Sequence, residues 1–511
     1  MANPKTKQMS KEQRKLFDLL WEDREENAKV LEKPSMEGTK TSVIDKYSEQ
    51  AHFIYELLQN ADDVKATKAT FELNKDGLLF SHNGKIHFSI SDPQTEWEDK
   101  AVGKLGHVNS ITSIGNTTKI ESEIGKFGYG FKSVFQYTST PHVYDPPFTF
   151  KIERLVVPIL LSGDHPERVG SETMFFLPFN SDNKPPDRAF DEIGGLLKKL
   201  DCHPLLFLRY LEKVEWRDND GNLGIYRKKP DTEKKDNIIS LITNVNGESS
   251  ERRFLVFKGE ITDPHRSDIQ HTIGVAFNLH LTDNQIISDN KYPAYCFFAT
   301  REETGLRFIV QAPFLLTDNR EGIKQGENWN GELIGELSEL VANSLPKLRD
   351  IGLFNNDSLQ FLPIEYFPED HLFHPVYGAV LNKFRSEERL IPGKEGGHIN
   401  ANQAILARGK ELTDLLDSKQ LSLLLGREDA EWVDTNITEN TPLWDYLNKK
   451  LEIPVLRPEG VANHLHDEFM EEQTDKWIAS FYAYLIEYPK LWKSPTSVLR
   501  KKEFIRLEDN T

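Results

Sequence analysis

Cysteine is scarce in this chain: Cys202 and Cys296 are its only two among 511 residues, and both lie in apolar surroundings far apart in the sequence. Two such cysteines do not suit a disulfide framework or a zinc site, so we expect buried free thiols in a reducing cytosol. The chain also lacks any uninterrupted apolar run of about 18 residues, and its N-terminus lacks the apolar stretch of an export signal. These absences predict a cytoplasmic protein without a membrane-crossing segment.

Basic residues are outnumbered, because 63 Lys and Arg face 81 Asp and Glu, which gives a formal net charge of −18. A chain with this balance repels polyanions, so we expect no broad nucleic-acid or anionic-membrane surface, although local basic patches are compatible with it. Hydrophobic residues make up 38% and charged residues 28% of the sequence, as in folded globular proteins. The length suits about two to four domains.

A glycine-rich segment, ESEIGKFGYGFKSVF at residues 121–135, carries the most information about function. Its glycines are followed by apolar residues at helical spacing, which predicts a tight bend that opens a buried helix. Because glycine has no Cβ, backbone N–H groups in such a bend can converge on an anion, and a helix N-terminus adds positive partial charge. We therefore expect a nucleotide phosphate here; a flexible turn before a core helix is the alternative.

A helix is predicted upstream, in IYELLQNADDVKAT at residues 54–67. Glu56 and Asn60 are four residues apart and project from one side of this helix, while its apolar residues face the core. The amide oxygen of Asn60 is a suitable ligand for Mg²⁺, and Glu56 can accept a proton from an attacking water molecule. The alternative is an ordinary polar helix face. The presence of both segments in this order favours a magnesium-nucleotide site.

Together these segments resemble the GHKL superfamily of ATPases, which includes the ninety-kilodalton heat-shock chaperones, MutL, gyrase B and the sensor histidine kinases. ELLQNADD resembles the first family box, and GKFGYGF resembles the glycine box that forms the lid over the phosphates. IGNTTK at 114–119 resembles the lid edge and implies a phosphate contact by Lys119. SETMFFLPF at 171–179 resembles the closing strand, whose threonine, here Thr173, helps to hold adenine.

The resemblance implies an α+β fold with a Bergerat-type α/β sandwich, ATP and Mg²⁺ as ligands, Glu56 as the catalytic base and Asn60 as the metal ligand. The nucleotide-binding residues that it implies are Asn60, Asp63, His82, Asn83, Gly84, Lys119, Gly125, Lys126, Phe127, Gly128, Tyr129, Gly130, Phe131, Lys132 and Thr173.

One family box departs from the usual pattern. The aspartate of an Asp-x-Gly segment reads the adenine amino group in most of the superfamily, but here the strand GLLFSHNG ends in His82, Asn83 and Gly84. A subset that resembles sacsin and the plant NO VEIN protein carries this His-Asn-Gly form and shares the phrases NADD and FKSVF. A neutral imidazole and a carboxylate offer different acceptors. The base specificity therefore stays open, while phosphate binding is expected.

The pattern divides the chain into an ATP-binding domain at 1–185, a middle α/β domain at 190–350 and a mainly helical region at 351–511. A helix over residues 10–32, capped by Ser10, is expected to pack on the ATPase core or on a partner subunit. Strand-like runs predict an antiparallel-leaning sheet, and NSDNKPPDRA at 180–189 has the composition of a linker. The runs of the first domain are 69–73, 78–81, 148–161 and 173–179.

The middle region carries the strand-like runs FLVFKG, HTIGVAFNLHL, AYCFFAT and LRFIVQAPFLL, then a loop that opens a long helix. By resemblance this is a transducer domain, in which Arg320 of the loop reaches the γ-phosphate as a second catalytic residue. The alternative is a surface arginine paired with Glu321 or Asp318. In the last region, helical runs are predicted at 401–425 and 465–490. His464 and His466 are expected to be solvent or core histidines.

These features predict a slow ATPase module that couples lid and domain closure to a partner or downstream effector, as chaperones do, with a homodimer as one arrangement. A nucleotide-sensing scaffold without significant hydrolysis, for example in a bacterial defence complex, is the alternative. A histidine kinase is a third reading, disfavoured because the sequence has no phosphoacceptor helix. The chain is also expected to be the front part of a larger protein.

Overall fold

The structure, a computed structural model, describes residues 8–38, 52–114, 130–230, 237–264, 270–288, 290–317, 322–356, 358–364 and 367–506. The chain forms two compact units. Unit 1 comprises Met1–Leu281, Pro293–Glu303 and Ile309–Leu333, and unit 2 comprises Thr282–Tyr292, Thr304–Phe308 and Ile334–Thr511. Unit 1 thus includes the predicted ATP-binding domain and most of the predicted middle domain. The three-part division stays a prediction.

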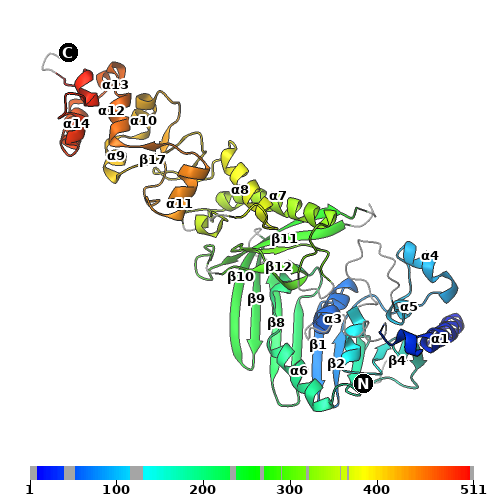
Figure 1. Cartoon of the computed structure of the whole chain (residues 1–511). Helices are drawn as coiled ribbons and strands as arrows, with labels where there is room; N and C mark the ends of the chain where they lie inside the picture. The colour runs from blue at the N-terminus through cyan, green and yellow to red at the C-terminus, as the bar shows by residue number, and fades with distance from the viewer. Residues whose placement is uncertain are drawn as a thin grey trace. The chain divides into compact units, whose positions relative to one another are not determined.

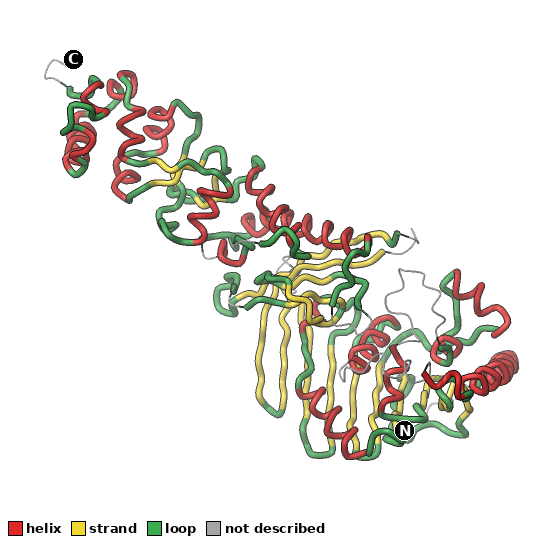
Figure 2. The backbone as a smooth tube through the Cα atoms, viewed as in Figure 1, coloured by secondary structure: helices red, strands yellow, loops and turns green. Residues whose placement is uncertain are grey.

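Unit 1 is built on a fourteen-stranded mixed sheet, so its fold is α+β (Figures 1 and 2). The strand order is β13-β12-β14-β11-β10-β9-β8-β7-β1-β2-β6-β3-β4-β5. Neighbours are antiparallel except for the parallel pairs β1 with β7 and β12 with β14. The strands are β1 (Lys68–Asn74), β2 (Gly77–His82), β3 (His142–Asp145), β4 (Phe148–Glu153), β5 (Val157–Leu160), β6 (Thr173–Pro178), β7 (Lys213–Asp218), β8 (Leu223–Pro230), β9 (Ile238–Val245), β10 (Glu248–Thr262), β11 (Gln270–Leu279), β12 (Pro293–Cys296), β13 (Phe298–Glu303) and β14 (Ile309–Gln311).

Alternation of apolar and polar residues explains β1, in which every second residue is buried. A continuous apolar run explains its partner β2, which is buried on both faces. For two runs the sequence predicts one strand each, but in the structure each run forms two antiparallel strands joined by a turn. The run at 148–161 turns at Arg154 and Leu155, whose φ angles are 49° and 70°. AYCFFAT turns at Phe297, with φ of 61°. These left-handed residues lack the usual glycine or asparagine signal of a turn.

Helix α1 (Lys11–Leu31) begins as predicted, with Ser10 and Gln13 forming a capping box. It packs on the core of its own unit. The Phe17 ring lies 5.9 Å from that of Phe150 on β4, and Glu25 pairs with Arg154 between β4 and β5. Among the described residues of unit 1, the α-helices between α1 and β7 are α3 (His52–Asp63), α4 (Glu96–Ala101), α5 (His107–Ile111) and α6 (Pro186–Lys198). Because α6 starts at Pro186, it includes the last part of the predicted linker.

Unit 2 combines helices with short strands. Helix α7 (Asn328–Asp350), the predicted long helix, enters this unit, and α8 (His374–Arg385) follows. A parallel sheet β18-β17-β19 lies in the region that was expected to be mainly helical. Its strands are β18 (Glu431–Trp432), β17 (Ala404–Ala407) and β19 (Val455–Leu456), and a second pair joins β15 (Ile391–Pro392) with β16 (His398–Ile399). The remaining helices are α9 (Lys410–Leu415), α10 (Ser418–Leu425), α11 (Pro442–Asp445), α12 (Pro458–His464), α13 (Asp467–Glu471) and α14 (Asp475–Ile486).

The predicted helical run at 401–425 is therefore partly wrong, because its first residues form β17. Trp432 of β18 is 1% exposed and anchors a core that includes residues of α9, α10, α12, α13 and α14. His466 serves as the N-cap of α13, since its Nδ1 accepts from the backbone N–H of Phe469 at 3.2 Å. No helix within the described ranges is long and apolar enough to cross a membrane.

Candidate functional site

Helix α3 carries the two residues predicted for metal binding and catalysis. Its apolar residues Ile54, Leu57 and Leu58 are buried, as predicted. Glu56 and Asn60 are also largely buried, with 9% and 5% exposed surface. Among the residues that the structure describes, no hydrogen-bond partner is found for the side-chain amide of Asn60. Its oxygen is therefore available to a ligand, as a metal site requires.

Helix α3 packs against η3 (Gly130–Gln136), which contains the C-terminal part of the glycine-rich segment. Phe131 and Val134 of η3 are 1% and 0% exposed, so the predicted buried helix is present as a short 3-10 segment. Gly130 is the first residue of η3. Several predicted residues lie outside the described residues, so their roles stay predictions: Lys119, Gly125, Lys126, Phe127, Gly128, Tyr129 and Arg320.

Lys132 of η3 is almost completely buried and is held by backbone carbonyls. Its Nζ donates to the carbonyl oxygens of Ile111 at 2.8 Å and Leu155 at 2.6 Å. Burial lowers the pKa of Lys132 to about 7, and the positive charge of Arg24 acts in the same direction. The ammonium thus joins α5 to the turn between β4 and β5. Its predicted contact with a phosphate is not visible in this arrangement and stays a prediction.

Two aspartates end helix α3. Asp62 is buried, and its carboxylate accepts the backbone N–H groups of Arg209, Tyr210 and Leu211 at 2.7 to 3.0 Å. Three such donors suit a buried carboxylate and fasten α3 to the chain that enters β7. Asp63 is exposed. Desolvation and the neighbouring Asp62 raise the pKa of Asp63, while Arg209 lowers it, and water at the exposed side chain weakens all three effects.

As predicted, the His82-Asn83-Gly84 segment lies at the end of β2: His82 is the last residue of the strand, and Asn83 and Gly84 follow it. The Asn83 side-chain oxygen accepts from the backbone N–H groups of Thr67 and Lys68, both at 2.9 Å, so it fixes the start of β1. His82 is 3% exposed, and its Nδ1 accepts from the N–H of Gly84 at 3.2 Å. A Cβ on Gly84 would lie 2.6 Å from the Val64 side chain and 2.9 Å from Nδ1 of His82. Glycine is therefore required for this close approach.

Thr173, the first residue of β6, pairs with His82 across the β2–β6 ladder. Its hydroxyl donates to Asp145 at the end of β3 at 2.5 Å. Asp145 is fully buried; it also accepts from the backbone N–H of Phe88 at 2.7 Å and lies 2.8 Å from Nδ1 of His87. Asp145 was not among the predicted site residues. The sequence feature that could have pointed to it is a lone carboxylate at the end of the strand-like phrase HVYD, directly before two prolines.

The ring of Phe175 on β6 brings several of these residues together. Its centroid lies 5.6 Å from the Phe131 ring, 6.2 Å from the Phe88 ring and 6.4 Å from the His82 ring. The end of β2, through His82, and η3, through Phe131, therefore both contact β6 at Phe175. Aromatic rings, a neutral imidazole and a threonine are groups that can hold a heteroaromatic base.

The described residues contain no cluster of three or more His, Cys, Asp or Glu side chains that could hold a metal ion. This does not conflict with the predicted metal, because Mg²⁺ commonly takes one or two protein oxygens and completes its shell with phosphate oxygens and water. Asn60 fits that pattern, since its amide oxygen is a hard, neutral ligand. A magnesium site here would therefore depend on a bound nucleotide.

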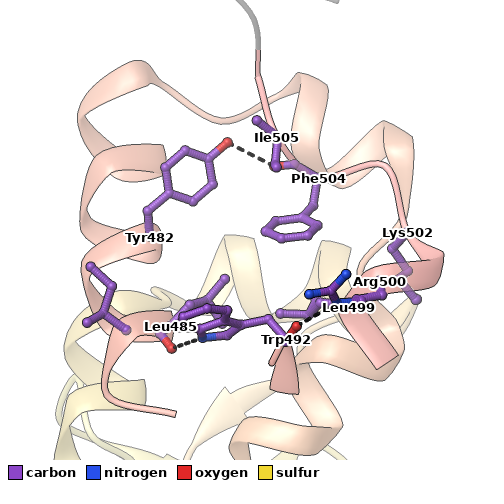
Figure 3. Close-up of a pocket in the computed structure, with 9 residues that line it drawn as sticks. Tyr482, Leu485, Trp492, Leu499, Arg500, Lys502, Phe504 and Ile505 are labelled. Atoms are coloured by element: carbon purple, nitrogen blue, oxygen red, sulfur yellow. Dashed lines mark hydrogen bonds between the residues drawn. The ribbon is translucent and has the colours of Figure 1, made fainter. Parts of the chain in front are cut away.

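A cavity of about 550 Å³ lies in unit 2, between α14 and the segment that follows it (Figure 3). Three hydrogen bonds join its lining residues. The Tyr482 hydroxyl donates to the Phe504 carbonyl at 2.9 Å, Trp492 Nε1 donates to the Leu485 carbonyl at 2.8 Å, and Arg500 Nε donates to the Trp492 carbonyl at 3.0 Å. It includes none of the predicted site residues. Its lining is mostly apolar: Tyr482, Leu485, Ile486, Trp492, Leu499, Arg500, Lys502, Phe504 and Ile505.

Comparison with known proteins adds two sequence matches. Residues 39–146 match the model of the sacsin domain. The chain is 30% identical over 401 residues to Protein NO VEIN of Arabidopsis thaliana, in a match that covers 68% of this chain and 13% of NO VEIN. The chain thus spans only a small part of that relative. The segment that matches the sacsin domain includes Glu56, Asn60, His82 and Asp145.

Among solved structures, the crystal structure of the N-terminal domain of a DNA repair protein matches with 12% identity and a TM-score of 0.33. That match covers 57% of this chain and 93% of the solved chain. The sequence matches support a sacsin and NO VEIN-like relationship for this chain.

Proposed function

We propose that the N-terminal part of this chain is a GHKL-type module with a Bergerat-type sandwich that binds Mg-ATP and hydrolyses it slowly. The observation that carries the proposal is on α3. The Asn60 amide is largely buried, has no partner within the described ranges and lies one helical turn from Glu56. This helix packs against η3, which contains the C-terminal part of the glycine-rich segment. This contact supports a site in which the metal ligand and the acid-base group of α3 act together with that segment.

Each residue has a distinct role in the proposed reaction. The Asn60 amide oxygen would hold Mg²⁺, which supplies charge neutralisation for the phosphates when it is bound. Glu56 orients the attacking water and accepts its proton. Backbone N–H groups of the glycine-rich segment, with Lys119 and Arg320, stabilise the charge of the transferred phosphoryl group. Thr173 helps to hold the base.

The module would act on a partner or a downstream effector, or on a second copy of the chain, through closure of the lid and of the middle region. Support comes from the continuous sheet, in which β1 pairs directly with β7. A nucleotide-sensing scaffold without significant hydrolysis is the second candidate, because the replacement of the usual aspartate by His82 alters the site at the base. Both candidates require nucleotide binding, and they differ in turnover.

Calorimetric titration of ATP with and without Mg²⁺, with phosphate release measured on the same sample, tests the proposal. Asn60→Ala should remove the magnesium-dependent part of the affinity, because it deletes the ligand oxygen. Asn27→Ala, at an exposed position of α1, is the matched control and should bind like the wild type. If folded Asn60→Ala keeps the full magnesium dependence, the metal assignment is wrong. Binding without phosphate release would favour the sensor.

A further inference from the structure

The imidazole of His82 offers a hydrogen-bond donor where a carboxylate would offer only acceptors. Its Nδ1 accepts the backbone N–H of Gly84 at 3.2 Å, so Nδ1 carries no proton. A neutral imidazole has one protonated and one unprotonated nitrogen. The proton therefore resides on Nε2, which becomes a donor.

The ring stays neutral at physiological pH. Burial lowers the pKa of His82 to about 4, and the nearby His87 contributes in the same direction. The bond from Gly84 adds a geometric reason, because a proton on Nδ1 would face the proton of that N–H group. The Gly84 backbone lies beside Nδ1, and the Phe80 and Phe175 ring centroids lie 5.8 and 6.4 Å from that of His82, so these neighbours restrict rotation of the ring.

The neighbouring polar groups are already engaged. The Thr173 hydroxyl donates to Asp145, whose carboxylate also accepts from Phe88 N and contacts His87. In the described part of the chain, no acceptor is found for Nε2–H of His82. The His82 residue is nearly buried, but its Nε2 is not fully enclosed, so this donor opens on space next to Thr173 in which a ligand can supply the acceptor.

We propose that His82 reads a purine base through Nε2–H, so that the site prefers 6-oxopurine nucleotides, of the inosine and guanosine type, over ATP. This proposal rests on the proposed nucleotide site. The 6-amino group of adenine is a donor and would oppose Nε2–H, whereas the 6-oxo group is an acceptor and would meet it. The aspartate found at this place in most of the superfamily would instead accept a hydrogen bond from the 6-amino group.

Inosine triphosphate is the best probe, because it differs from ATP in the group at position 6 and in the protonation of the ring nitrogen beside it, with no added 2-amino group. We expect wild-type protein to bind Mg-ITP about three- to tenfold more tightly than Mg-ATP, the range of one net hydrogen bond. His82→Asp should reverse the order, because a carboxylate accepts from the 6-amino group. His280→Asp, at an exposed position of the same unit, should keep the wild-type order.

His82→Asn provides a second variant in case the aspartate disturbs folding. Its amide carries both a donor and an acceptor, so the ratio of the two affinities should move towards one. A wild-type affinity for Mg-ATP equal to or higher than that for Mg-ITP would overturn this inference and leave the proposed nucleotide site intact. An unchanged ratio in both folded variants would also overturn it. If neither triphosphate binds, the proposed function fails, and the inference fails with it.

Discussion

Lys132 gives the sharpest test of how the core of unit 1 is built. Its ammonium is almost fully buried, bonds only to the carbonyls of Ile111 and Leu155 among the described residues, and has its pKa lowered from 10.5 to about 7 by burial. Between these two values the folded state holds Lys132 neutral while the unfolded chain holds it protonated. The unfolded state then binds more protons, so stability rises with pH across this window.

The magnitude follows from the width of the window. Each pH unit within it is worth about 1.4 kcal/mol, so the change from pH 7 to pH 9 corresponds to about 2 to 3 kcal/mol. Lys132→Met keeps the length of the side chain and removes the titration. The free energy of unfolding of wild type should therefore rise by about that much relative to Lys132→Met over this interval.

Urea unfolding at both pH values, followed by tryptophan fluorescence, measures the difference. Lys85→Met, at an exposed lysine of the same unit, should follow the wild-type response. Comparison with the wild type cancels the titration of the other groups, since both proteins share them. Equal pH dependence in wild type and Lys132→Met would refute the argument that the ammonium is desolvated in the folded protein.

Two further predictions concern the chemistry. Glu56→Ala should bind ATP within a few-fold of wild type and hydrolyse it about a hundredfold more slowly, since a general base contributes about 10² to 10⁴ to the rate. Phosphate release and calorimetry on one sample measure the two quantities. An equal loss of affinity and of hydrolysis would show that Glu56 is structural. Arg320→Ala should bind ADP normally, hydrolyse ATP poorly and lose the protection of residues 180–190 from proteolysis by ATP, with little rescue by Arg320→Lys. A wild-type hydrolysis rate in Arg320→Ala would exclude a phosphate contact.

Helical periodicity was sufficient to predict α3. The 3.6-residue repeat fixes which residues share a face, so the burial of Ile54 and Leu57 and the common side of Glu56 and Asn60 followed directly. Alternation predicted β1 in the same way, and short continuous apolar runs predicted β2 and β6. The turn at Arg154 and Leu155 escaped detection, because both flanking strands are apolar and neither residue type signals a left-handed backbone.

The roles of Lys132 and Asp145 could not be predicted, because their partners are distant in the sequence. Lys132 bonds to carbonyls 21 and 23 residues away, and Asp145 accepts from groups 28 and 57 residues away. Local spacing contains no information about such contacts. The strands of unit 2 escaped for a different reason: β17, β18 and β19 have two to four residues, too few to show a period.

Helix α3, which carries the proposed metal ligand, also binds the segment that leads into β7. Asn60 and Asp62 are two residues apart on α3, and Asp62 binds the backbone of residues 209–211, directly before β7. The N–H groups of Glu212 and Lys213 then both donate to the carbonyl of Thr67 at the start of β1. A shift of α3 on nucleotide binding would therefore act on β7 through short, buried hydrogen bonds. Under the proposed function, coupling to the middle region would not depend on the loop of Arg320 alone.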